Sequence, residues 1–223
     1  MRTDSQIQKD IQDEMKWDPS LRDDDIGVSV HDGVITLAGF VDSYADKWKA
    51  ERMVSTVKGV KAVANDLEVK LPTSFSRPDP DIARAALDAL EWNVTVPNDR
   101  IKVKVEKGWV TLEGDVDWNF QREEAERAVR NLTGVVGVTN LITVHARPAP
   151  TDIKQKIKEA LERSAEFDAD RITVEIDGHT AILRGTVRSF AEKRDAERAA
   201  RKAPGVTDVE NHLNVEPSLL ATV

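Results

Sequence analysis

Residues 108–114 read Gly-Trp-Val-Thr-Leu-Glu-Gly, a short apolar strand pattern bounded by glycines. A second copy, Gly-Val-Ile-Thr-Leu-Ala-Gly, occupies residues 33–39, and a diverged third copy, Thr-Ala-Ile-Leu-Arg-Gly, occupies residues 180–185. Similar segments that recur at a domain-sized spacing indicate several copies of one folding unit. The chain of 223 residues is therefore predicted to contain three small modules in tandem.

The residues around each copy predict the same order of elements. In the second unit, apolar residues first recur at four-residue spacing, which indicates a helix, and then alternate with polar residues, which indicates a strand. A turn, a second strand, a second helix closed by glycine and a third strand follow. The positions that carry this pattern are Ile82, Ala86, Leu90, Ile101, Val103, Val105, Val110, Leu112, Val116, Gly134 and Val144. The predicted order is helix, strand, strand, helix, strand.

Proline-containing joints separate the units. The predicted domains are residues 1–72, 78–147 and 149–218, joined by segments 71–78 and 146–150. Proline fixes its own φ and disfavours helix in the residue before it, so the joints are expected to be stiff and extended.

The composition limits the classes of function that the protein can have. The chain has no cysteine. Its residues are 40% hydrophobic and 32% charged, which is typical of soluble globular proteins. Its first residues enter a polar helix pattern, and no run approaches the roughly 18 apolar residues of a membrane span. A soluble, cytoplasmic protein without transmembrane segments is expected. The net charge of -8 is spread over all three units, which argues against nucleic acid as a partner and weakens binding to anionic membranes.

Residues suited to catalysis or metal binding do not form a recognisable motif. The four histidines lack ligand spacing, so no metal site is expected. Acidic clusters at residues 23–25, 98–99 and 168–170 lack the rest of a calcium loop and are interpreted as turn residues. The glycines match no phosphate loop, and no nucleophile and base recur together. The sequence therefore predicts no cofactor and no enzyme activity.

Several aromatic residues are candidates for an apolar contact surface. Where one unit has an aromatic residue and its siblings have charged or small ones, the position is not a demanding core site. This comparison selects Trp48, Trp118, Phe120 and Phe40, and Trp109 of the repeated stretch joins them. Packing between units and contact with a lipid or protein partner both remain open for this set.

Two further patterns at helix positions have competing interpretations. Trp17 and Trp92 share a position just past the first helix of their units and are predicted to pack against the helix end. Lys154 and Lys158 give the third unit a basic helix face, which suits either an anionic surface or water.

With the repeat established, each unit resembles the BON domain. The resemblance rests on residues 108–116, Arg122, Ala125-Glu126, Gly134-Val135 and Val138-Thr139-Asn140, and on their counterparts in the other units. It implies an α+β fold of three tandem α-β-β-α-β modules, each a small mixed three-stranded sheet packed against two helices. It also implies phospholipid binding and a link to envelope integrity or osmotic stress, and relatives make a periplasmic location the alternative.

The sequence thus predicts a non-catalytic, stress-associated bacterial protein that binds phospholipid or membrane surface peripherally through its tandem modules. A protein-interaction scaffold or chaperone-like protein is the alternative. A small ligand held between units is a third possibility that would need a concave pocket.

Overall fold

The computed structural model describes residues 2–19, 21, 25–145, 153–163 and 171–216. The first module contains α1 (Asp4–Trp17), β1 (Ile26–His31), β2 (Val34–Val41), α2 (Tyr44–Thr56) and β3 (Ala62–Val69). The second contains α3 (Asp79–Glu91), the short 3-10 helix η1 (Asn98–Arg100), β4 (Ile101–Glu106), β5 (Trp109–Val116), α4 (Asn119–Arg130) and β6 (Gly137–Val144). The third contains α5 (Ile153–Arg163), β7 (Ile172–Asp177), β8 (Thr180–Val187), α6 (Phe190–Arg201) and β9 (Asp208–Val215).

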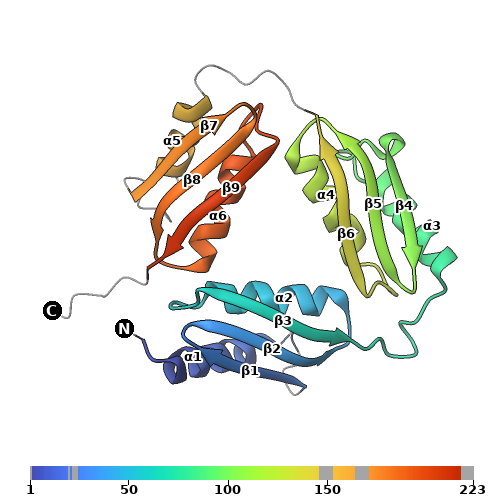
Figure 1. Ribbon diagram of the computed structural model, residues 1–223. Coiled ribbons are helices and arrows are strands. Elements are labelled where there is room, and N and C mark those ends of the chain that lie inside the picture. The colour runs from blue at the N-terminus through green and yellow to red at the C-terminus, as the bar shows by residue number, and fades with distance from the viewer. Residues whose placement is uncertain (1, 20, 22–24, 146–152, 164–170, 217–223) are drawn as a thin grey trace. The chain divides into compact units, whose positions relative to one another are not determined.

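Each module builds its own sheet from three consecutive strands, in the orders β1-β2-β3, β4-β5-β6 and β7-β8-β9 (Figure 1). In the second module β4 and β5 form an antiparallel hairpin, and β6 returns through α4 to pair with β5 in parallel. The third module repeats this arrangement. The expectation of tandem α-β-β-α-β modules with mixed sheets is confirmed.

The hydrophobic core of each module lies between one face of its sheet and its two helices, as Figure 1 shows for α3 and α4. In the second module the stripe Ile82, Ala86 and Leu90 is buried, as its helical spacing predicts. It meets Val110 and Leu112, which alternate with exposed residues along β5. The opposite face of the same strands carries the outward-facing side chains.

The glycine that ends each repeated stretch is required by a close backbone approach. Gly114 has φ +137°, and a Cβ there would lie 2.1 Å from the carbonyl oxygen of Arg100, the residue just before β4. Gly39 and Gly185 have the same geometry against Asp25 and Arg171. The repeated glycine is therefore structural, as predicted from the strand pattern.

An aspartate at the start of the first helix holds the hairpin turn. Asp79 accepts hydrogen bonds of 2.8 Å from the backbone N–H groups of Lys107 and Gly108. Asp4 accepts equivalent bonds from Asp32 and Gly33 in the first module. These bonds satisfy turn donors that the strands leave unpaired, and they fix the hairpin to the helix.

The joints between modules are only partly described. The first joint is not fully extended as expected, because the N–H groups of Phe75 and Ser76 donate to the Pro72 carbonyl and form a turn. The second joint, at residues 146–150, and the acidic residues 23–24 and 168–170 lie outside the described residues. The predicted domain borders at residues 147 and 149 lie in the same undescribed part and remain predictions.

Candidate functional site

Trp109, one of the predicted site residues, borders a hollow on the open face of the second sheet. We define this open face by the outward residues of β4, β5 and β6, which include Lys102, Lys104, Trp109, Thr111 and Thr139. The helices cover the other face of the sheet (Figure 1), so the open face is built from side chains that the core does not use.

Trp109 lies flat against the strand beside it. Parallel pairing sets Trp109 opposite Gly137, and the indole Nε1–H donates a 2.8 Å hydrogen bond to the hydroxyl of Thr139. A Cβ on residue 137 would stand 2.5 Å from two ring carbons of Trp109, so glycine is needed for the ring to adopt this position. The residue Trp109 is 48% exposed and keeps an accessible surface while its indole N–H is bonded.

A hollow of about 360 Å³ adjoins the indole ring. Its lining combines an aromatic surface, two cationic groups, one anionic group and one hydroxyl. The residues are Lys104, Glu106, Lys107, Trp109, Thr111 and Val136. Lys104 and Glu106 approach to 3.6 Å, but both are well exposed, so this pair adds little to stability. The hollow can therefore offer both signs of charge to a small polar molecule.

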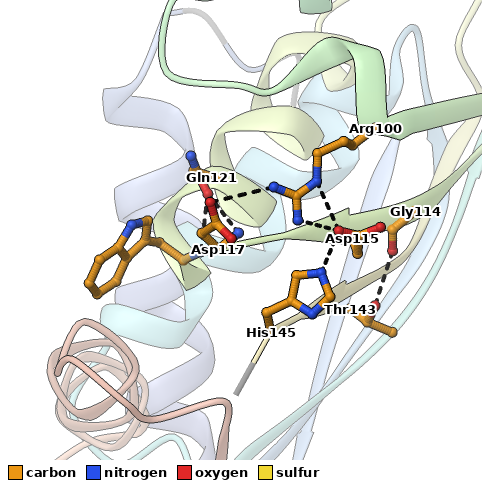
Figure 2. A network of polar contacts seen from close by, with 8 residues as sticks. Arg100, Gly114, Asp115, Asp117, Gln121, Thr143 and His145 are labelled. Atoms are coloured by element: carbon orange, nitrogen blue, oxygen red, sulfur yellow. Dashed lines mark hydrogen bonds and ion pairs between the residues drawn. The ribbon is translucent and has the colours of Figure 1, made fainter. Parts of the chain in front are cut away.

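A polar network occupies the other end of β5 (Figure 2). The Nε of Arg100 donates to Asp115 at 2.9 Å, a second nitrogen of the same guanidinium also donates to Asp115, and its Nη1 lies 3.4 Å from Asp117. The His145 Nε2 lies 2.7 Å from the same Asp115 oxygen. The Arg100 hydrogen bond lowers the pKa of the Asp115 carboxyl, and the His145 contact lowers it further.

This network joins η1, the end of β5 and the residue after β6, but it has no arrangement for covalent catalysis. The hydroxyl near it, on Thr143, donates to the carbonyl of Gly114 rather than facing His145, as Figure 2 shows. The Asp115 carboxylate, which orients His145, is at the same time bound by Arg100. The geometry is that of a structural ion-pair cluster, which ties the ends of three elements together. No metal-binding group of His, Asp or Glu was found among the described residues.

The other predicted site residues lie in separate places. Phe40 is exposed on β2, with the Lys70 ammonium 3.0 Å from its ring centroid. Phe120 is exposed on the first turn of α4, beside the N-cap residue Trp118, which is half-buried. Trp48 is half-buried on α2. Their roles as an apolar contact remain predictions.

The basic face predicted for the third module is present on α5. Lys154 and Lys158 are exposed one turn apart, while Ile153 and Ile157, each one residue before a lysine, are buried. The helix is therefore amphipathic, as its spacing predicts, but a ligand for the two lysines remains a prediction.

The prediction for Trp17 and Trp92 was wrong. Both are 86% exposed, so neither packs against its helix end. Each stands two residues after the last buried residue of its helical stripe, Met15 or Leu90. Two residues are about 200° of helical rotation, which points a side chain away from the core. This two-residue offset is visible in the sequence, and it could have identified Trp17 and Trp92 as exposed.

The comparisons with known proteins agree with the repeat. A family model described as BON domain matches residues 3–70, 78–146 and 150–217. The chain belongs to the BON domain family. A curated relative, osmotically-inducible protein Y of Escherichia coli strain K12, is 30% identical over 125 residues, which span 54% of this chain and 62% of the relative. The match thus spans less than two thirds of that relative's length.

Two solved structures of CdsD, described as a structural protein of the type III secretion system of Chlamydia trachomatis, are also similar. The first is 17% identical, with 95% of this chain and 92% of the other covered and a TM-score of 0.27. The second, a C-terminal domain, is 16% identical, with 94% and 96% covered and a TM-score of 0.25. Similarity at this level supports no conclusion about function. Among the described residues, no helix has the length and apolar character to cross a membrane.

Proposed function

We propose that this protein is a non-catalytic, stress-associated protein that binds phospholipid membranes peripherally by inserting exposed tryptophans. The relative named for osmotic induction supports the association with stress. Membership of the BON family supports the absence of catalysis. The single observation that carries the membrane role is the pair Trp17 and Trp92, which occupy equivalent positions and are both 86% exposed.

The exposed tryptophan of the second module has an apolar neighbour. Val94, two residues after Trp92, is 98% exposed in the loop that leaves α3. Trp is enriched at membrane interfaces because its ring is apolar while its N–H still reaches water. A Trp and a Val at the end of one helix can enter the headgroup region without burying backbone polar groups of the helix interior. The loop is therefore suited to shallow insertion.

The charge of the chain favours apolar insertion over electrostatic attachment. At a net charge of -8, the protein is repelled as a whole by an anionic bilayer. Weak apolar contacts from two modules on one chain act together through effective concentration where both can reach the surface. Binding is expected to depend more on the tryptophans than on salt.

Vesicle sedimentation tests the proposal. Full-length protein is mixed with zwitterionic and with anionic vesicles, and the fraction that sediments is compared for the parent, Trp17→Ser, Trp92→Ser and the double variant. Each single change is expected to weaken binding about fivefold to tenfold, because apolar ring area no longer leaves water. Trp109→Val is the matched control, since it removes an exposed Trp from a sheet face. The proposal fails if neither vesicle type sediments more protein than a vesicle-free sample, or if the double variant sediments like the parent.

A further variant tests the alternative of a protein-interaction scaffold or chaperone-like protein. That role would use Phe120, which is exposed beside Trp118 on α4. Phe120→Ser is expected to leave vesicle binding unchanged, whereas capture of a protein partner that is lost in Phe120→Ser and kept in the Trp17→Ser/Trp92→Ser variant would favour the alternative. The cytoplasmic location expected from the sequence is likewise a proposal, which cell fractionation tests.

A further inference from the structure

The arrangement of Trp109, Gly137 and Thr139 is specific to the second module. Equivalent positions in the other sheets hold residues that cannot reproduce it, although the strands pair in the same way. They are Val34, Ala62 and Ala64 in the first module, and Thr180, Asp208 and Glu210 in the third. The residues at these three positions, which lie on two strands, thus differ together between the modules, although the shared fold does not require the combination found in the second. This module has a feature that the common fold does not need.

The indole ring is held in place before any ligand arrives. Its N–H is bonded to Thr139, its inner surface lies where a Cβ on residue 137 would be, and its outer surface borders the hollow. A ring fixed in this way loses little conformational freedom on binding, so more of its contact energy is available for affinity. Aromatic side chains beside a few polar groups in a hollow are typical of small-molecule sites.

The charges of the hollow select an anion. Two lysines, Lys104 and Lys107, and a single carboxylate, Glu106, line it, so its local charge is positive although the chain as a whole carries -8. A quaternary ammonium group would suit the tryptophan but would be repelled by the lysines. An anionic group fits the lysines once Lys104 turns from its 3.6 Å contact with Glu106, and Glu106 and Thr111 can then hydrogen-bond hydroxyl groups.

We propose that this hollow binds a small saccharide that carries an anionic group, either phosphate or carboxylate. The C–H face of the sugar ring stacks on the Trp109 indole, Lys104 and Lys107 bind the anion, and Glu106 and Thr111 bind ring hydroxyls. The volume of about 360 Å³ is at the lower end of the usual range for ligand sites, about 300–1,000 Å³, which suits a small ligand. The site is independent of the proposed membrane contact, which uses Trp17 and Trp92.

Indole N–H signals in NMR spectra of the full-length protein test the proposal. The chain has five tryptophans, so five indole signals are expected, and Trp109→Val assigns the one of interest by its loss. The probes are glucose 6-phosphate, glucose and inorganic phosphate. Glucose 6-phosphate is expected to shift the Trp109 signal saturably with a millimolar Kd, and each half of the molecule alone is expected to bind at least about tenfold more weakly.

Matched variants separate binding from folding. Lys104→Gln and Lys107→Gln are each expected to weaken glucose 6-phosphate binding about fivefold, while Lys102→Gln, on the same strand face but outside the hollow, has no effect. Trp109→Val copies the residue of the first module and is expected to fold, and glucose 6-phosphate then no longer shifts the backbone amides of Thr111 and Val136. Equal shifts by glucose 6-phosphate and inorganic phosphate, equal shifts by glucose, or no saturable shift of Trp109 would each overturn the proposal.

Discussion

The contact between Trp109 and Gly137 predicts a substitution whose effect reverses with its background. In the parent, Gly137→Ala places a Cβ 2.5 Å from two indole carbons, against a normal carbon separation of about 3.5–4.0 Å. The ring must leave its position, and the Nε1 hydrogen bond to Thr139 is lost with it. Keeping the ring in place would overpack the site at a cost of about 1–3 kcal/mol. Moving it away loses the hydrogen bond, which costs about 0.5–1.5 kcal/mol, so the ring is expected to move.

Without the ring, the same substitution is favourable. Gly137 has ordinary strand backbone, and alanine in a strand is favoured over glycine by about 0.5–1 kcal/mol. In the Trp109→Val background, Gly137→Ala is therefore expected to stabilise the module, which then carries the Val and Ala pair of the first module at residues 34 and 62. The gain from alanine applies in both backgrounds, so the effect of Gly137→Ala should differ between them by the cost of displacing the ring, about 0.5–1.5 kcal/mol.

Amide hydrogen exchange measures this difference in the full chain. The exchange rates of Val110 and Leu112, which are buried on β5, report the free energy of opening of the second module without requiring the whole chain to unfold in one step. The four proteins of the cycle are compared at one pH and temperature. If Gly137→Ala changes this free energy by the same amount in both backgrounds, to within about 0.5 kcal/mol, the described contact between ring and glycine is refuted.

Three further predictions concern the same module. Gly114→Ala should destabilise it by about 3 kcal/mol or more, because φ is +137 and the new Cβ lies 2.1 Å from a backbone oxygen; a loss under 1 kcal/mol by hydrogen exchange would contradict this. Asp79→Ala should cost about 1–2 kcal/mol and speed exchange at Lys107 and Gly108, with unchanged exchange there as the contrary result. The pKa of Asp115 is lower in the folded protein than its ordinary value of 3.8. Its stabilising contribution is therefore present at pH above the pKa of the unfolded chain and is lost as pH falls through the pKa of the folded protein. The melting-temperature gap between parent and Asp115→Asn should therefore shrink below about pH 4, and a gap constant from pH 6 to 3 would be contrary.

The sequence was most informative about what all three modules share. The spacing of Ile82, Ala86 and Leu90, and the alternation along Val110 and Leu112, appear in each copy, so the buried face of every element could be predicted. The glycine at residue 114 was also predictable, because it recurs where two backbones approach. Repetition supplied the evidence that a single copy of the pattern would not have given.

The features particular to one module were harder to predict. That Gly137 lies beneath Trp109 depends on the register between β5 and a parallel strand, which lies 28 residues further along the chain and has no turn to fix it. The hollow is formed by side chains from β4, the turn after it, β5 and the residue before β6, a combination that no linear motif records. Trp92 was misassigned because proximity to a helix end was weighed above the angle at which its side chain leaves the helix.

Fluorescence quenching by vesicles with brominated acyl chains tests the membrane role most directly. Bromine quenches only those indole rings that reach the hydrocarbon boundary, so the parent is expected to lose emission, and Trp17→Ser/Trp92→Ser to lose much less although it retains the three other tryptophans. Equal fractional quenching of the parent and the double variant, or no quenching of either, would contradict insertion by Trp17 and Trp92.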